Sequence, residues 1–172
     1  MQSHKSTEDP KVTSKTIMAL WADLHHRKRE LWLPVLSGSM LPLLNIGDNV
    51  LVQSIEPSKI RFGDVIVFKD LDKFIVHRVI KTYKNERISF LQKGDNSTAA
   101  IIVSGENLIG MVNFVRKRNR LICINHGAWK IFNYFLIFFS TSVFYLKPGN
   151  PILRRIARFL FNKIIQVHEY VK

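Results

Sequence analysis

The sequence predicts a mainly β protein: a coiled, barrel-like β domain with a helix before it and a helical hairpin after it. Between residues 31 and 122, short β-branched runs alternate with Gly-Asp turns, which is typical of a small barrel. Helical periodicity is confined to residues 14–30 and 123–172. A composition of 47% hydrophobic and 23% charged residues allows a packed core and excludes disorder throughout the chain.

The first thirty residues divide into a tail and a helix. Residues 1–13 are polar and predict a flexible tail, without the apolar run of a secretory signal peptide. From Ser14, a candidate N-cap, apolar residues recur at helical spacing and predict a helix over residues 14–30. His25 and His26 would diverge by about 100° on that helix, so they do not indicate a metal site.

The β domain is expected over residues 31–122. Its strands are predicted at residues 31–36, 49–54, 63–69, 73–83, 87–93 and 109–117. Gly-Asp pairs stand at residues 47–48, 63–64 and 94–95, at or next to the ends of predicted strands, and such pairs favour turns. We therefore interpret Asp48 and Asp64, each of which follows a glycine, as turn residues.

The positive charge is concentrated in the last third of the chain. Residues 1–115 carry fifteen Lys and Arg against twelve Asp and Glu, whereas residues 116–172 carry eleven against one. Such a concentration predicts an anionic partner for this segment, which is a membrane surface or a nucleic acid.

The same segment predicts a helical hairpin. Residues 128–146 are rich in aromatic side chains, and residues 152–167 form a basic amphipathic pattern after a Pro-Gly turn. The hypothesis is a hairpin that lies on or dips into the membrane; the alternative is that the aromatic helix packs on the β domain as core. The candidate membrane contacts are Trp129, Phe132, Leu136, Phe139, Arg154, Arg155 and Arg158.

The most specific pattern in the chain is the segment 36–44 (LSGSMLPLL), with an ordered series of blocks after it. The blocks are residues 47–52 (GDNVLV), 63–68 (GDVIVF), 74–80 (FIVHRVI), 93–96 (KGDN) and 109–112 (IGMV). Together they resemble the type I signal peptidase family over roughly residues 33–115. A histidine stands at the base position, so the chain is similar to the archaeal and endoplasmic-reticulum type rather than to the bacterial lysine type.

The resemblance implies a serine endopeptidase with the signal-peptidase fold. Ser39 would be the nucleophile and His77 the general base, since a serine hydroxyl needs a neighbouring base to take its proton. Asp95 is the candidate carboxylate that orients the histidine. The hydroxyl of Ser37 and the backbone N–H of Ser39 would line the oxyanion hole. The acidic residue that histidine-type members often carry shortly after the KGDN turn is replaced here by residues 97–100 (STAA).

Two other functions compete with this one. A self-cleaving repressor-type peptidase has a related fold and a serine–lysine dyad, for which Lys73 is the candidate, although residues 1–30 carry no helix-turn-helix pattern. The second competing function is that of a non-catalytic protein that binds nucleic acid through its basic C-terminal segment. The single cysteine, Cys123, excludes an intrachain disulfide and a thiolate zinc site, and we expect neither metal nor cofactor.

As the resemblance implies, the substrate would be an exported or membrane-tethered precursor polypeptide, cut where side chains are small. The expected location is a membrane, the plasma membrane in the first instance.

Overall fold

The computed structural model describes residues 30–118 and 120–124, and six separate positions: Ile131, Tyr134, Phe135, Ile137, Phe138 and Phe159. The predicted tail and, except for Glu30, the predicted N-terminal helix lie outside the described residues. So does most of the predicted hairpin over 123–172. The same holds for the candidate membrane contacts Trp129, Phe132, Leu136, Phe139, Arg154, Arg155 and Arg158.

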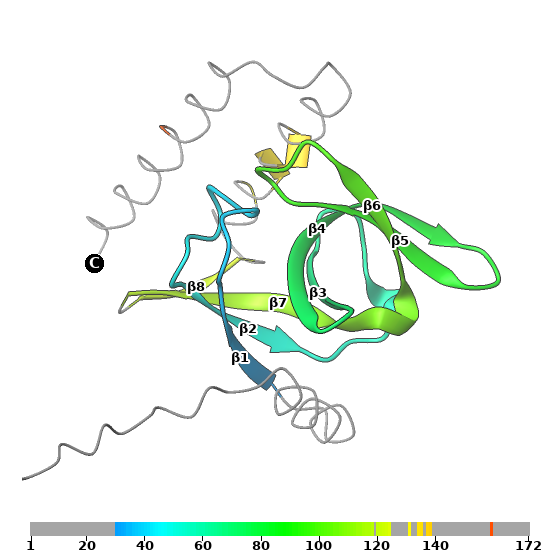
Figure 1. Ribbon diagram of the computed structural model, residues 1–172, viewed down its shortest axis with the longest axis horizontal. Helices are drawn as coiled ribbons and strands as arrows, with labels where there is room; N and C mark the ends of the chain where they lie inside the picture. The colour runs from blue at the N-terminus through cyan, green and yellow to red at the C-terminus, as the bar shows by residue number, and fades with distance from the viewer. Residues whose placement is uncertain are drawn as a thin grey trace, which may run out of the picture.

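The described chain forms one antiparallel sheet that curls on itself (Figure 1). Its spatial order is β1-β2-β7-β3-β4-β5-β6, and β8 pairs with β7. The mainly β, coiled fold that the sequence predicts is therefore confirmed. The strands are β1 (Glu30–Pro34), β2 (Asn49–Gln53), β3 (Val65–Asp70), β4 (Lys73–Lys84), β5 (Ile88–Lys93), β6 (Ala100–Ser104), β7 (Leu108–Lys117) and β8 (Arg120–Cys123).

Six of these strands were predicted, and β6 and β8 were not. β6 is an edge strand on which two successive residues, Ile101 and Ile102, are exposed, so the alternation that marks a half-buried strand is absent. β8 begins within the basic run 116–120, which lacks the composition typical of strands. Two short 3₁₀ turns, η1 (Pro57–Lys59) and η2 (Gly105–Asn107), complete the described elements.

The strand β3 is buried on both faces because the sheet curls around it. Val65 and Val67 contribute to one apolar cluster, while Ile66 and Phe68 contribute to a second. A strand with two buried faces needs a continuous apolar run rather than alternation, and the VIVF run of β3 supplies it. The two clusters together form the core of the β domain.

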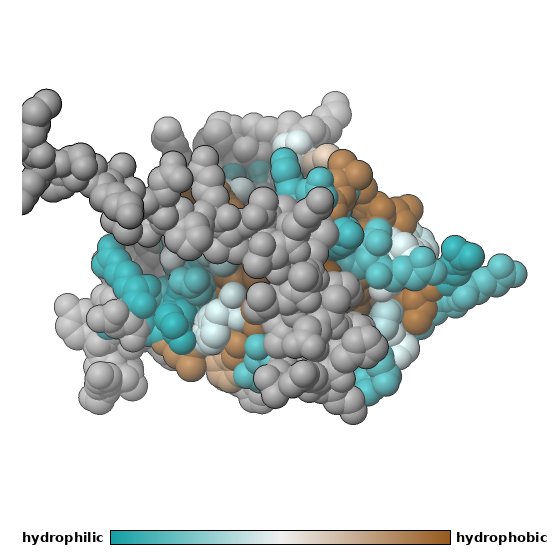
Figure 2. All heavy atoms as spheres, turned by 60° about the horizontal axis from the view of Figure 1, so that its bottom comes forward, coloured by the Kyte–Doolittle hydropathy of each residue, from teal (hydrophilic) through white to brown (hydrophobic). Residues whose placement is uncertain are grey.

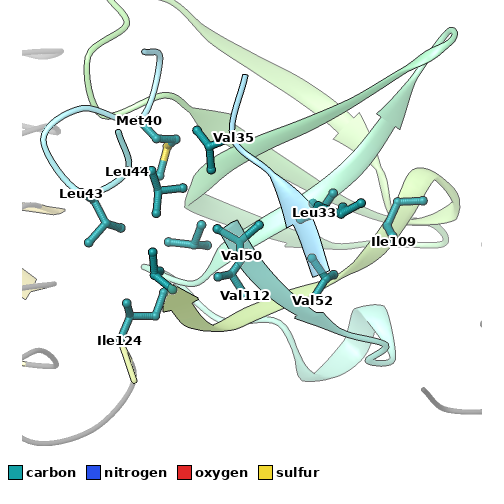
Figure 3. Close-up of a cluster of buried hydrophobic side chains, with 13 residues drawn as sticks. Leu33, Val35, Met40, Leu43, Leu44, Val50, Val52, Ile109, Val112 and Ile124 are labelled. Atoms are coloured by element: carbon teal, nitrogen blue, oxygen red, sulfur yellow. The ribbon is translucent and has the colours of Figure 1, made fainter. Parts of the chain in front are cut away.

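The loop between β1 and β2 is anchored in the first cluster (Figure 3). Met40, Leu43 and Leu44 are 1%, 1% and 0% exposed and lie in one cluster with Val35, which follows β1, and Val50 of β2. Leu41 and Pro42 are joined by a cis peptide bond. The buried side chains that follow Ser39 therefore hold the loop in place, while Leu36 and Ser37 before it stay at the surface.

The predicted turn roles of Asp48 and Asp64 are confirmed. Each carboxylate accepts a backbone N–H three residues earlier in the chain, from Asn45 and Arg61 respectively, both at 2.8 Å. Asp48 also accepts from Lys117 at the end of β7. The glycine before each aspartate, Gly47 and Gly63, has a positive φ that favours glycine there.

Several large apolar side chains lie at the surface, and Figure 2 shows apolar and strongly hydrophilic surface side by side on one face. Leu36 and Leu71 are 81% and 85% exposed. Ile137 is 3% exposed and packs so closely on Gly63 that a Cβ there would lie 2.5 Å from its Cδ1 atom. Within the described part of the chain, we find no helix with the length and apolar character that crossing a bilayer requires.

Candidate functional site

The segment 37–40 presents two hydroxyl groups on one side of the loop after β1. The Oγ atoms of Ser37 and Ser39 lie 3.3 Å apart, and Ser37 is exposed while Ser39 is half-buried. The loop tightens through a hydrogen bond from the Leu41 N–H to the Gly38 carbonyl at 3.2 Å. The next residue, Met40, enters the core, so the serine pair is held at the point where the loop leaves the surface.

The side chain of His77 projects from β4 into the same site. Its Nδ1 atom lies 2.5 Å from the Oε1 atom of Gln92, which is on the neighbouring strand β5 and is 3% exposed. The ring of Phe68 lies on another side of the imidazole, with ring centroids 6.1 Å apart. The imidazole is therefore held by a polar contact at Nδ1 and an aromatic contact at its flank.

The turn after β5 joins the Ser39 loop to the imidazole. The backbone N–H of Asn96 donates to the Ser39 carbonyl at 2.8 Å, and the Asn96 side-chain amide donates to the Gly38 carbonyl at 3.3 Å. A Cβ on Gly94 would lie 2.7 Å from the Ser39 carbonyl oxygen and 3.0 Å from His77 Nε2. Nε2 therefore faces the Ser39 loop across a glycine, and any side chain at that position would separate the two.

Asp95 is bound to a buried arginine. Its Oδ1 accepts from Arg78 Nε at 2.7 Å, and its Oδ2 accepts from Arg78 Nη2 at 2.8 Å. The two side chains are 0% and 2% exposed, and Arg78 Nη1 also donates to the Gly63 carbonyl at 2.9 Å. The side-chain hydrogen bonds described for Asp95 are thus made with Arg78, and the side-chain hydrogen bond described for His77 is made with Gln92.

A groove of about 640 Å³ runs past Ser39 and His77. The loop after β1 forms one wall, and the first residues of β4 form the other. Its lining is mostly apolar, with Asp72 and Lys73 at the end where β4 begins. The lining residues are Leu33, Pro34, Val35, Leu36, Ser37, Ser39, Met40, Leu44, Asp72, Lys73, Phe74, Ile75, Val76 and His77.

Burial lowers the pKa of His77 below its ordinary value of 6.5, because the charged imidazolium is poorly solvated there. The hydrogen bond to Gln92 and the negative charge of Asp95 act in the opposite direction, and the positive charge of Lys93 lowers the pKa further. The imidazole is therefore neutral at pH 7, which is the form that accepts a proton.

The structure brings three of the predicted site residues, Ser37, Ser39 and His77, to one groove, and it places Asp95 on Arg78. Lys73 lines the groove four residues before His77, which is about 13 Å along a strand. Gln92 was not predicted as a site residue, because a glutamine in a strand has no ionisable group that would indicate a role in the site. Within residues 30–118 and 120–124, no three acidic, histidine or cysteine side chains converge as a metal site.

Comparison with known proteins gives relatives that are named as signal peptidases. Over 67 residues, 37% of this chain and 35% of the relative, it is 45% identical to the signal peptidase complex catalytic subunit SEC11C of Homo sapiens and of Mus musculus. Over 79 residues, 43% of this chain and 42% of the relative, it is 42% identical to signal peptidase I W of Bacillus subtilis (strain 168). The chain thus matches less than half the length of these relatives. No family model matches it.

We predict that Asp95→Asn lowers the free energy of unfolding by about 3–5 kcal/mol, because it removes the carboxylate charge that is ion-paired with the buried Arg78 guanidinium. Urea denaturation of the full chain at pH 7 measures the loss. Asp64→Asn is the matched control, since Asp64 also follows a glycine and burial raises the pKa of its carboxyl. An amide oxygen can still accept the Arg61 N–H, so this control should cost about 1 kcal/mol or less. Equal losses in the two variants would contradict the prediction.

Proposed function

We propose that this chain, a relative of the type I signal peptidases, is a serine endopeptidase that cleaves exported or membrane-tethered precursor polypeptides at sites with small side chains. One observation carries the proposal: a single groove contains the Ser39 hydroxyl and the His77 imidazole, with Nε2 facing the Ser39 loop. The preference for small side chains follows from the family resemblance. The similarity to SEC11C and to signal peptidase I W supports the same class of reaction.

In the proposed reaction, Ser39 Oγ attacks the carbonyl carbon of the scissile peptide bond while His77 Nε2 takes the hydroxyl proton. The carbonyl oxygen becomes an oxyanion that the Ser37 hydroxyl and the Ser39 N–H stabilise. The imidazolium then gives its proton to the leaving amine, and the C–N bond breaks to leave an acyl-enzyme on Ser39. Water, activated by the neutral imidazole, hydrolyses this ester and restores both side chains.

Asp95 supports this chemistry through its charge. The carboxylate is fixed by two hydrogen bonds from Arg78, and its negative charge raises the pKa of His77 against the stronger effect of burial. It therefore stabilises the imidazolium that forms during the reaction. We propose that Asp95 acts on catalysis in this way and by holding the turn that positions Ser39.

The groove suits an extended peptide. β3 pairs with β4 from Lys73 to Arg78, but β5 pairs with β4 only from Arg78 onward, so in the described sheet residues 73–77 have one unpaired backbone edge. β1 lies at one end of the sheet order and forms the opposite wall. An extended substrate segment can add to such an edge through main-chain hydrogen bonds, with its alternate side chains in the apolar groove. We propose that the peptide binds along β4 and passes Ser39 at the end of this edge.

We also propose that the protein works at an anionic membrane surface. The basic residues of the last third support this, and so do the exposed apolar side chains Leu36 and Leu71, which lie on or next to the walls of the groove. A precursor whose apolar segment stays in the bilayer would then present its cleavage site next to the groove. The same basic segment could bind nucleic acid, which the vesicle experiment below distinguishes.

Cleavage of a precursor peptide tests the proposed reaction. Purified protein in lipid micelles, given a signal-peptide precursor with an Ala-x-Ala junction, should make one cut after the junction, detected by mass spectrometry. Ser39→Ala and His77→Ala should each abolish the cut, since they remove the nucleophile and the base. Ser58→Ala, in the remote turn η1, should cleave normally. Cleavage by either site variant would remove that residue from the mechanism, and no cleavage by the parent protein would contradict the proposed activity on this substrate.

Gly94→Ala tests the close approach of nucleophile and base. Its Cβ would enter the space between the Ser39 carbonyl and His77 Nε2, so we expect kcat to fall by two orders of magnitude or more, as a displacement of about 1 Å can do. Gly105→Ala is the control, because its Cβ would meet the Ile88 carbonyl at 2.9 Å, remote from the site. Rates are compared per folded molecule, with the folded fraction taken from circular dichroism. Similar rate losses in both variants would contradict the assigned geometry.

Vesicle flotation tests the membrane proposal. Replacement of Arg154, Arg155 and Arg158 by Gln should weaken binding to phosphatidylserine-containing vesicles on the order of 100-fold, from about 1 kcal/mol per basic residue. Substitution is preferable to deletion of the segment, because Ile137 packs on Gly63. The control replaces Arg27, Lys28 and Arg29 by Gln, which removes the same charge elsewhere. Equal weakening by both triple variants, or tight binding to DNA without binding to vesicles, would contradict the proposal.

A further inference from the structure

We propose that Gln92 is the residue that positions the general base: its side-chain oxygen accepts the Nδ1–H of His77 and so leaves Nε2 unprotonated towards Ser39. The inference rests on the proposed roles of Ser39 and His77, and it names the partner that those roles require. Gln92 touches neither the substrate nor the reacting atoms. It acts through the imidazole and is a positioning residue.

The contact is direct and shielded from solvent. Gln92 lies on β5 opposite Val79 of β4, two residues along the strand from His77, and its side chain reaches back to Nδ1 at 2.5 Å. Since Gln92 is 3% exposed, bulk water does not compete freely for the same nitrogen. A neutral imidazole carries its proton on one nitrogen, and the hydrogen bond at one nitrogen decides which. An acceptor at Nδ1 therefore selects the tautomer with a free lone pair at Nε2.

Asp95, the carboxylate expected for this task, is already engaged. Each of its oxygens accepts a hydrogen bond from the buried Arg78 at 2.7–2.8 Å. To reach His77 instead, it would have to break a buried ion pair. The ring of Phe68 restricts rotation of the imidazole on another side. The geometry thus provides a fixed ring, a fixed tautomer and a neutral partner.

A neutral partner has a measurable consequence for pH dependence. The charged groups around His77 are Lys93 on β5, Asp95 in the following turn, Arg78 on β4, and Asp72 and Lys73 at the distant end of the groove. Burial keeps the pKa of His77 below 6.5. The amide adds no negative charge at Nδ1 that would offset this effect of burial on the His77 pKa. A carboxylate at the same point would raise this pKa by about 1–3 units.

The test uses two substitutions of Gln92 in the full chain and one matched control. Gln92→Glu is isosteric, keeps an acceptor at Nδ1 and adds a charge. Gln92→Ala removes the acceptor. Gln53→Glu is the control, because Gln53 also accepts a side-chain hydrogen bond, from Asn113, but on β2 and away from the groove. For each protein, kcat/KM is measured against pH with the precursor peptide. Nitrogen-15 NMR of His77 gives its tautomer and pKa without any substrate, with the signal identified by its loss in His77→Gln.

Four results are expected. In the parent protein, NMR shows the Nδ1–H tautomer and the acid limb of kcat/KM lies below pH 6.5. Gln92→Glu keeps that tautomer and moves both the His77 pKa and the acid limb up by about a unit or more. Gln92→Ala mixes the tautomers and lowers kcat by about tenfold or more with little change in KM. Gln53→Glu leaves the tautomer and the acid limb unchanged.

Other results would overturn the inference. An Nε2–H tautomer in the parent protein would do so, because the amide would then donate rather than accept. An unchanged His77 pKa in Gln92→Glu would do so as well, and this variant still reports if Gln92→Ala fails to fold. If the parent protein does not cleave the peptide, the proposed activity fails on that substrate, whereas the NMR measurements still decide whether Gln92 sets the tautomer.

Discussion

The buried ion pair between Arg78 and Asp95 holds the site together. Arg78 on β4 donates to the carboxylate of the turn after β5 and to the Gly63 carbonyl of the turn before β3. Three segments that are remote in sequence thereby meet at one guanidinium, which only a planar group with several donors can arrange. His77 is the next residue on β4, so alternation sends its side chain to the groove while Arg78 points inward. The position of the His77 imidazole is therefore fixed by the residue beside it.

The same turn also holds the loop that carries Ser39. Asp95 lies between Gly94, which leaves room for the Ser39 carbonyl and His77 Nε2, and Asn96, whose N–H donates to that carbonyl. On its other side the serine loop is held by Met40 and Leu44 in the core. Backbone hydrogen bonds and apolar anchors thus restrain the loop from two directions. The proposed role of Ser39 as nucleophile requires preorganisation of this kind, because small displacements of the reacting atoms are costly.

Much of this arrangement was predictable from the sequence. The ordered blocks around Ser39, His77 and the KGDN turn indicated the signal-peptidase relationship, and the Gly-Asp turns delimited six strands. The edge strand β6 was not predicted. Its two exposed residues, Ile101 and Ile102, are adjacent in the sequence and both apolar, so the alternation of apolar and polar residues that marks a half-buried strand is absent. The hydrogen-bond partners of Asp95 and His77 were not predicted either, for a different reason. They depend on cross-strand register, including the irregularity between Val79 and Lys81, and a linear pattern does not encode which strands become neighbours.

A glutamine at position 92 is consistent with the charge already present. A second carboxylate beside His77 would stand near Asp95, and neighbouring like charges raise each other's pKa and disfavour ionisation. Asp95 cannot leave Arg78 without breaking a buried ion pair. An amide oxygen satisfies the Nδ1–H without adding to this repulsion, at the expense of weaker stabilisation of the imidazolium. In the proposed site, the carboxylate of Asp95 thus acts through its charge and its ion pair with Arg78, while a neutral amide orients the imidazole.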